Sequence, residues 1–246
     1  MEDLQDWYQQ FYAPNNATLV VVGDVNPGEV LALARRYFGE YKSNSNLQKS
    51  AKLAIPLKAN SKILRLKAKL PLYVLGFHTP SLKTAERPKT AYSLEMLAYV
   101  LDNGLAKTLI RNKQIATNIS LNYRLYSQFD GLFTLSFTPA EGVSSENVLA
   151  EIKKQVAKLI NQPHLITAEL SRIKAQLEAE FIFQQDQIST QAYYLGTLAT
   201  VGLGVEELFS YVDKMNEITA AEVIHAAKIY LNFAAANSVE LIAEGL

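Results

Sequence analysis

Two alternating segments separated by a turn dipeptide constrain the fold of this chain more than any other feature of its sequence. Apolar side chains occupy every second position in residues 119–125 and again in 133–137, and Asp130-Gly131 lies between the two segments. Alternation with this period is typical of a strand with one face on a core, and Asp-Gly is a preferred hairpin turn. The apolar positions are Ile119, Leu121, Tyr123, Leu125, Phe133, Leu135 and Phe137. The sequence therefore predicts an antiparallel hairpin that covers a hydrophobic core.

Strands and a helix are expected before this hairpin. The alternation over residues 63–70 predicts a half-buried strand, and the apolar run 73–77 predicts a second one. Pro88 is expected to open a helix, and Asp102-Asn103-Gly104 is expected to break it before a short helix that reaches about Asn112. The core face of the first helix is predicted to consist of Ala91, Leu94, Leu97, Val100 and Leu101.

The chain after the hairpin is predicted to be mostly helical. An apolar stripe over residues 148–159 predicts one helix, and Thr167 and Ser189 are expected to cap two more. Thr219 with Glu222 forms a capping box that opens a helix to Leu231, and residues 238–243 predict a last strand. The expected fold class is α+β, with a mostly antiparallel sheet flanked by helices.

The first 42 residues look like the end of a separate unit. Residues 3–12 predict a helix, and the β-branched and apolar run 18–22 predicts a strand buried on both faces. Asn26 is expected to cap a second helix that ends before Gly39. Residues 43–60 are rich in Ser, Asn, Lys and Ala and are interpreted as a linker. A weak resemblance between residues 11–25 and 230–246 suggests a duplicated unit.

Composition excludes several classes of function. The chain has 24 basic and 24 acidic residues, and this balance argues against a nucleic-acid surface, which needs clustered Lys and Arg. It has no cysteine, so disulfides and thiolate metal sites are excluded. No apolar run approaches the length of a membrane span.

The sequence offers few candidates for chemistry. The histidines are His78, His164 and His225, and they form neither H-x-x-E-H nor H-E-x-x-H, so each is interpreted as a non-ligating residue. There is no G-x-S-x-G motif that would indicate a nucleophilic serine. Arg111 is the one charged residue singled out, and taken by itself it is interpreted as a basic residue at a helix C-terminus.

Several segments together resemble the M16 family of zinc peptidases, which includes insulinase, pitrilysin and the mitochondrial processing peptidase. The segments are YAPNNATLVVVGDVNPGEVLALARRYFG, LEMLAYVLDNGLAKTLIRNK, DGLFTLSFTPA and ITAAEVIHAAKIYL, and the first is the most specific. In this family two homologous α+β halves, with the fold of LuxS-like metallohydrolases, form a clamshell. The first half carries the zinc motif H-x-x-E-H, and the second lacks it and closes over the peptide.

The resemblance implies a division of the chain and a function. Residues 1–42 would be the terminal strand and helix of the preceding homologous half, 43–60 the linker, and 61–246 the C-terminal M16-type domain. The chain would be the non-catalytic, substrate-enclosing part of a zinc endopeptidase and inactive by itself. Zinc is expected in the full-length protein and no cofactor in this chain. The implied partners are a peptide substrate and a second M16 subunit, and the implied compartment is the periplasm.

The resemblance also assigns a role to Arg111. It matches an arginine that contacts substrate in the family's second half, within IRNKQIATNIS. The tyrosine that accompanies this arginine is absent, because Thr117 and Asn118 stand in its place. Two alternatives stay open beside the peptidase: a catalytically inactive partner or structural subunit of an M16 hetero-oligomer, and an unrelated α+β binding module.

Overall fold

The computed structural model describes residues 2–47 and 59–244, and the chain divides into two compact units. One unit contains residues 55–180 and 210–246, and the other contains residues 1–54 and 181–209. The linker expected at 43–60 lies largely in residues 48–58, outside the described part of the chain.

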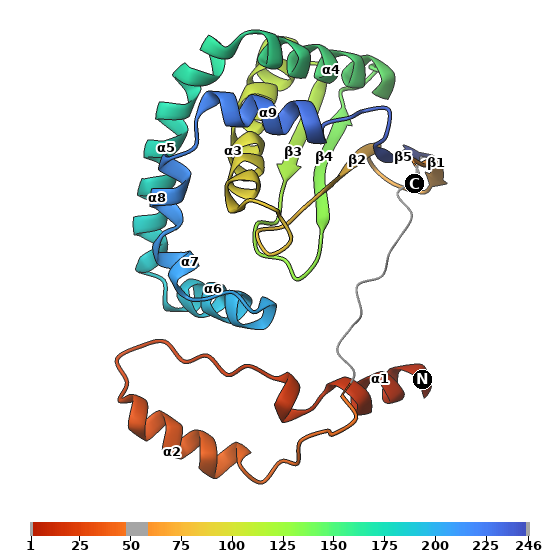
Figure 1. The fold of residues 1–246 in the computed structure, drawn as a ribbon. Coiled ribbons are helices and arrows are strands. Elements are labelled where there is room, and N and C mark those ends of the chain that lie inside the picture. Colours follow the sequence, from red (N-terminus) through yellow and green to blue (C-terminus); the bar gives the residue numbers. More distant parts are fainter. Residues whose placement is uncertain (1, 48–58, 245–246) are drawn as a thin grey trace. The chain divides into compact units, whose positions relative to one another are not determined.

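The first of these units is built on a five-stranded mixed sheet with the order β1-β5-β2-β4-β3 (Figure 1). The strands are β1 (Ser61–Leu66), β2 (Leu72–Thr79), β3 (Ala116–Asn122), β4 (Gly131–Pro139) and β5 (Asn237–Ala243). β1 runs parallel to β5, and the other neighbours are antiparallel. The mostly antiparallel α+β fold predicted from the sequence is confirmed.

The predicted hairpin is strands β3 and β4. Ile119 pairs with Phe137 and Leu121 with Leu135, so the apolar positions of the two strands share one face. The same register continues into β2, where Leu75 pairs with Leu135 and Phe77 with Phe133. Tyr123 and Leu125 fall beyond the end of β3, because the strand stops at Asn122 and residues 123–130 connect it to β4.

Three helices cover this apolar face: α3 (Pro88–Leu105), α4 (Ser145–Asn161) and α9 (Ala220–Tyr230) (Figure 1). All five predicted core positions of α3 are at most 3% exposed. On α4, the side chains of Val148, Ile152 and Val156 are also at most 3% exposed. α9 begins at the predicted capping box, in which Thr219 accepts from the Glu222 N–H and the Glu222 side chain accepts from Thr219. Helical and strand periodicity therefore define one common core.

The remaining helices follow α4 in the chain. α5 (Pro163–Gln185) leads from this unit into the second one, which contains α6 (Ile188–Val201) and α7 (Glu206–Phe209). α8 (Tyr211–Asn216) belongs to the unit with the sheet. α5 begins four residues before Thr167 and α6 one residue before Ser189, so neither residue is the cap that the sequence predicted. α6 ends at Gly202, whose φ of 75° gives the left-handed C-cap.

The N-terminal segment contains α1 (Glu2–Phe11), the 3₁₀ turn η1 (Pro14–Asn16) and α2 (Pro27–Phe38). Both helices were predicted, and the Asn26 side chain accepts from the N–H groups of Gly28 and Glu29 as an N-cap. The strand predicted at 18–22 is wrong: these residues have no strand assignment, and Leu19 is 60% exposed. A strand needs a neighbour for its N–H and C=O groups, and no strand of the described residues pairs with this segment.

Two further predictions are corrected. Asp102-Asn103-Gly104 does not break α3, which continues to Leu105 and then into the π-helical segment η2 (Ala106–Asn112). The first strand ends at Leu66 rather than Leu70, and its residues are mostly exposed rather than half-buried. Contacts with distant parts of the chain account for both differences. Asp102 of α3 accepts a hydrogen bond from Leu121 of β3, and β1 lies at the edge of the sheet, where its side chains stay exposed.

Candidate functional site

Arg111 lies in η2, where the chain turns from α3 into β3. π-helical turns are rare and occur frequently at functional sites. Here the segment is held at its end by an ion pair of 2.8 Å between Lys113 Nζ and Glu151 Oε2 of α4. The Lys113 hydrogen bond is the largest influence on Glu151 and lowers the pKa of its carboxyl. Arg111 itself is exposed and makes no hydrogen bond or ion pair with the described residues, so its guanidinium is available to a ligand.

No tyrosine of β3 accompanies Arg111. Thr117 and Asn118 occupy the expected positions on the strand, and both are exposed. Tyr123 follows β3, but its hydroxyl donates to the carbonyl of Pro80 over 2.7 Å. Burial, with the nearby Glu95 carboxylate second, raises the pKa of Tyr123 above its ordinary value. Tyr123 is therefore a structural residue and does not replace the missing tyrosine.

Glu95 is an acidic residue with a buried carboxyl oxygen, and the sequence analysis did not identify it. It lies on α3, and its carboxyl Oε2 is buried with no hydrogen-bond partner among the described residues. The hydroxyl of Tyr211 on α8 donates to Oε1 over 3.2 Å. Burial raises the pKa of Glu95 to about 8, and the hydrogen bond from Tyr211 opposes this shift. Its position four residues after the core residue Ala91 was the available signal, since i and i+4 share a helix face.

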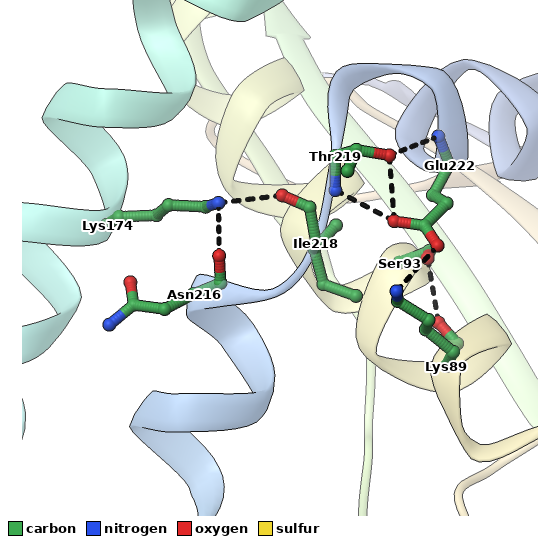
Figure 2. A network of polar contacts seen from close by, with 7 residues as sticks. All are labelled: Lys89, Ser93, Lys174, Asn216, Ile218, Thr219 and Glu222. Carbon is green, nitrogen blue, oxygen red and sulfur yellow. Dashed lines mark hydrogen bonds and ion pairs between the residues drawn. The ribbon is translucent and has the colours of Figure 1, made fainter.

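A polar network joins α3, α5 and the start of α9 (Figure 2). Lys174 of α5 donates to the carbonyls of Asn216 and Ile218 over 2.6 and 2.7 Å. Lys89 of α3 pairs with Glu222 over 3.0 Å, next to the capping box. Burial lowers the pKa of Lys174. Because the Lys174 ammonium is bonded to backbone carbonyls and the Glu222 carboxylate to Thr219 and Lys89, we interpret the network as a support for helix packing.

The described residues do not fit a zinc site. His78, His164 and His225 lie on β2, α5 and α9, and all three are exposed. His78 Nε2 is 3.5 Å from Asp130 Oδ2. No group of three or more His, Cys, Asp or Glu side chains within residues 2–47 and 59–244 could hold a metal ion. The described residues therefore offer no cluster of side chains that would hold zinc.

The described part of the chain also contains no helix of sufficient length and apolar character to cross a bilayer.

Comparison with known proteins agrees with the fold. A family model described as "Peptidase M16 inactive domain" matches residues 1–177. The zinc protease PqqE of Helicobacter pylori is 25% identical over 251 residues, which covers 94% of this chain and 54% of that protein. The chain thus spans about half the length of this relative.

Solved structures share the fold at low sequence identity. A protease from Helicobacter pylori matches with a TM-score of 0.86 and 20% identity over 98% of this chain and 59% of its own. A peptidase M16 inactive domain from Pseudomonas fluorescens matches with a TM-score of 0.81 and 18% identity, over 100% of this chain and 59% of that one. The first half of the periplasmic protease PqqL from Escherichia coli matches with a TM-score of 0.73 and 16% identity. This match covers 99% of this chain and 55% of that one. These structures share the fold of the chain, and the family match over residues 1–177 shows that the chain belongs to the M16 peptidase family, as its inactive domain.

Proposed function

We propose that this chain is the non-catalytic, substrate-enclosing part of a zinc-dependent M16-type endopeptidase and that it does not hydrolyse peptides alone. The observation that carries the proposal is the match of residues 1–177 to the family's inactive domain. The relationship to a zinc protease supports it, because this chain aligns with only 54% of that protein. The zinc ligands would come from residues outside this chain, in the same polypeptide or in a second M16 subunit.

The division of the chain is part of the proposal. Residues 1–42 would complete a preceding homologous half, 43–60 would connect the halves, and 61–246 would form the C-terminal domain. The exposed apolar side chains of α1 and α2 support this division, since Leu4, Trp7 and Phe38 are each more than half exposed. Their apolar surface would be covered by the preceding half. We further propose the periplasm as the compartment, by analogy with the PqqL protease.

Arg111 would contact the enclosed peptide. Its guanidinium is exposed on a segment anchored by the Lys113–Glu151 ion pair, so the group is held near the start of β3 without an internal partner. A guanidinium donates hydrogen bonds in a planar fork that suits a carboxylate or two carbonyl oxygens. Its role would be to orient the peptide against the zinc-bearing half, and the chemistry would take place there.

The first experiment measures peptide hydrolysis and bound zinc for this chain and for the protein extended by its upstream sequence. We expect chelator-sensitive hydrolysis and one equivalent of zinc in the extended protein only. The absence of both in the extended protein would support an inactive partner subunit of a hetero-oligomer. Zinc-dependent hydrolysis by this chain alone would contradict the proposal.

Arg111→Ala in the active assembly tests the substrate contact. We expect kcat/KM to fall by roughly tenfold or more, because a hydrogen bond to a charged group contributes about 1.5–3 kcal/mol, while the zinc content stays unchanged. Lys107→Ala is the matched control, since Lys107 is another exposed cation of η2. Equal activity of both variants and the parent protein would remove Arg111 from the site and leave the assignment as a peptidase half intact.

A further inference from the structure

The two edges of the sheet differ in how they are protected. β3 forms one edge, and there the Asp102 carboxylate of α3 accepts from the Leu121 N–H over 3.2 Å. β1 forms the other edge and has β5 as its sole neighbour among the described strands. An unprotected edge strand presents N–H and C=O groups that can pair with another extended chain. Within residues 2–47 and 59–244, the β1 edge is therefore the open one.

The hydrogen bonds between β1 and β5 show which backbone groups of β1 point away from the sheet. The carbonyl of Asn60 accepts from Ser238 N over 2.8 Å, and the carbonyl of Leu66 accepts from Glu244 N over 3.0 Å. Alternate residues of a strand bond to opposite sides, so even-numbered residues from 60 to 66 face β5. The N–H and C=O groups of Ser61, Ile63 and Arg65 consequently point away from the sheet.

The β1 edge and the segment that follows it carry positive charge. Residues 59–72 contain four basic side chains and no acidic one: Lys62, Arg65, Lys67 and Lys69. None of the four forms an ion pair with the described residues, and all are exposed. Two acidic residues lie on the β5 side of β1: Glu240 is opposite Ile63, and Glu244 follows β5 and donates its N–H to the Leu66 carbonyl. Ile63 is 58% exposed and Leu66 54%, so apolar contacts are available between the charges.

We propose that the β1 edge binds an extended acidic peptide segment, which adds to the sheet as a sixth strand beside Ser61, Ile63 and Arg65. Main-chain hydrogen bonds would supply affinity, and the basic side chains would select acidic residues on the incoming strand. The same charges reject a second copy of β1, because like charges on neighbouring strands repel. The assignment is independent of zinc and of peptide hydrolysis.

Binding is measured by the anisotropy of a labelled Glu-Val peptide added to the full chain. The peptide has about eight residues, a typical strand length, and repeats Glu-Glu-Val-Val, so that both of its faces carry carboxylates for Lys62 and Arg65. Ile63→Pro is the decisive variant. Proline removes an outward N–H and places its ring in the path of the incoming strand, while the bonds of β1 to β5 do not use this N–H. We expect its affinity to fall by roughly tenfold or more, which is about 1.4 kcal/mol, with an unchanged thermal unfolding midpoint.

Charge reversal provides a test that does not depend on proline. Lys62→Glu with Arg65→Glu should abolish binding of the Glu-Val peptide and create binding of a Lys-Val peptide. The control is Lys154→Glu on α4, an exposed lysine away from the sheet edge, which should change neither affinity. Equal binding of the two peptides to the unmodified chain, or full affinity in the Ile63→Pro variant, would overturn the proposal.

Discussion

At the scale of single residues, burial changes the chemistry of Glu95. The sequence places an ordinary carboxylic acid on a helix, but the fold buries its Oε2 between α3 and the segments packed on it. Removal of a carboxylate from water disfavours the charged form. The pKa of about 8 means that the folded protein keeps Glu95 protonated at neutral pH.

Glu95 should make the stability of the chain depend on pH. The unfolded state releases the proton near pH 4.5, whereas the folded state keeps it to about pH 8. The contribution of protonated Glu95 to the free energy of unfolding is therefore fully present below pH 4.5. It is lost as the pH rises to about 8, by about 1.4 kcal/mol for each unit by which the two pKa values differ. Glu95→Gln should remove this dependence, as measured by urea unfolding between these pH values.

The control for this measurement is Glu178→Gln, because Glu178 is an exposed acid of α5. This variant should keep the pH dependence of the unmodified chain. An unchanged dependence in Glu95→Gln would show that Glu95 is ionised in the folded state at neutral pH.

At the scale of elements, tertiary contacts decide where helices end. Asp102, Asn103 and Gly104 are typical of a helix end, yet α3 runs through them. Asp102 bonds to the Leu121 N–H, and Asn103 donates to the Tyr99 carbonyl over 3.0 Å. These bonds and the buried Leu101 and Leu105 hold the helix. At Gly202 the local signal and the structure agree, because its φ of 75° favours glycine.

Alanine at these two glycines should have opposite effects. A Cβ at Gly104 meets open space within a helix, so Gly104→Ala should raise the free energy of unfolding by about 0.5–1 kcal/mol. Gly202→Ala should lower it by about 1 kcal/mol, because alanine is strained in the left-handed region. Urea unfolding of both variants measures this, and destabilisation by Gly104→Ala would show that the chain needs a flexible break there.

At the scale of the whole molecule, the N-terminal helices and α3 differ in how many residues they bury. α3 contains ten buried residues, while α1 and α2 contain none. Helices of this length are marginal in water without tertiary packing. The N-terminal helices of the chain therefore lack, within the described residues, the packing that stabilises α3.

Hydrogen exchange should separate α2 from α9. The two helices have 12 and 11 residues and both begin at a side-chain N-cap, so their local signals are matched. Only α9 buries residues, among them Val223 and Ala227. We expect amides of α9 to exchange roughly a hundredfold more slowly than those of α2, since a hundredfold is about 2.8 kcal/mol of local opening. Equal protection of the two helices would show that α2 is packed in solution. Addition of the proposed preceding half of the protein should slow exchange in α2.

The sequence by itself determined the elements whose signals are local. Periodicity predicted the β3–β4 hairpin and the buried face of α3, and capping chemistry predicted the starts of α2 and α9. These features depend on residues a few positions apart, so they are visible without the fold. The resemblance that led to the M16 family rested on such segments, and the role of Arg111 stays a prediction.

The tertiary structure alone decided what depends on residues far apart in the chain. It places β1 in parallel beside β5, almost 180 residues later, with Ser61 paired to Ser238. It bonds the Glu95 carboxyl to the Tyr211 hydroxyl and Asp102 to one edge strand of the sheet, and it leaves the other edge strand, β1, with one neighbour among the described strands. It also leaves residues 18–22 without a strand. Local periodicity contains no information about which distant partner supplies a hydrogen bond or excludes water, and these partners set both the pKa of Glu95 and the accessibility of β1.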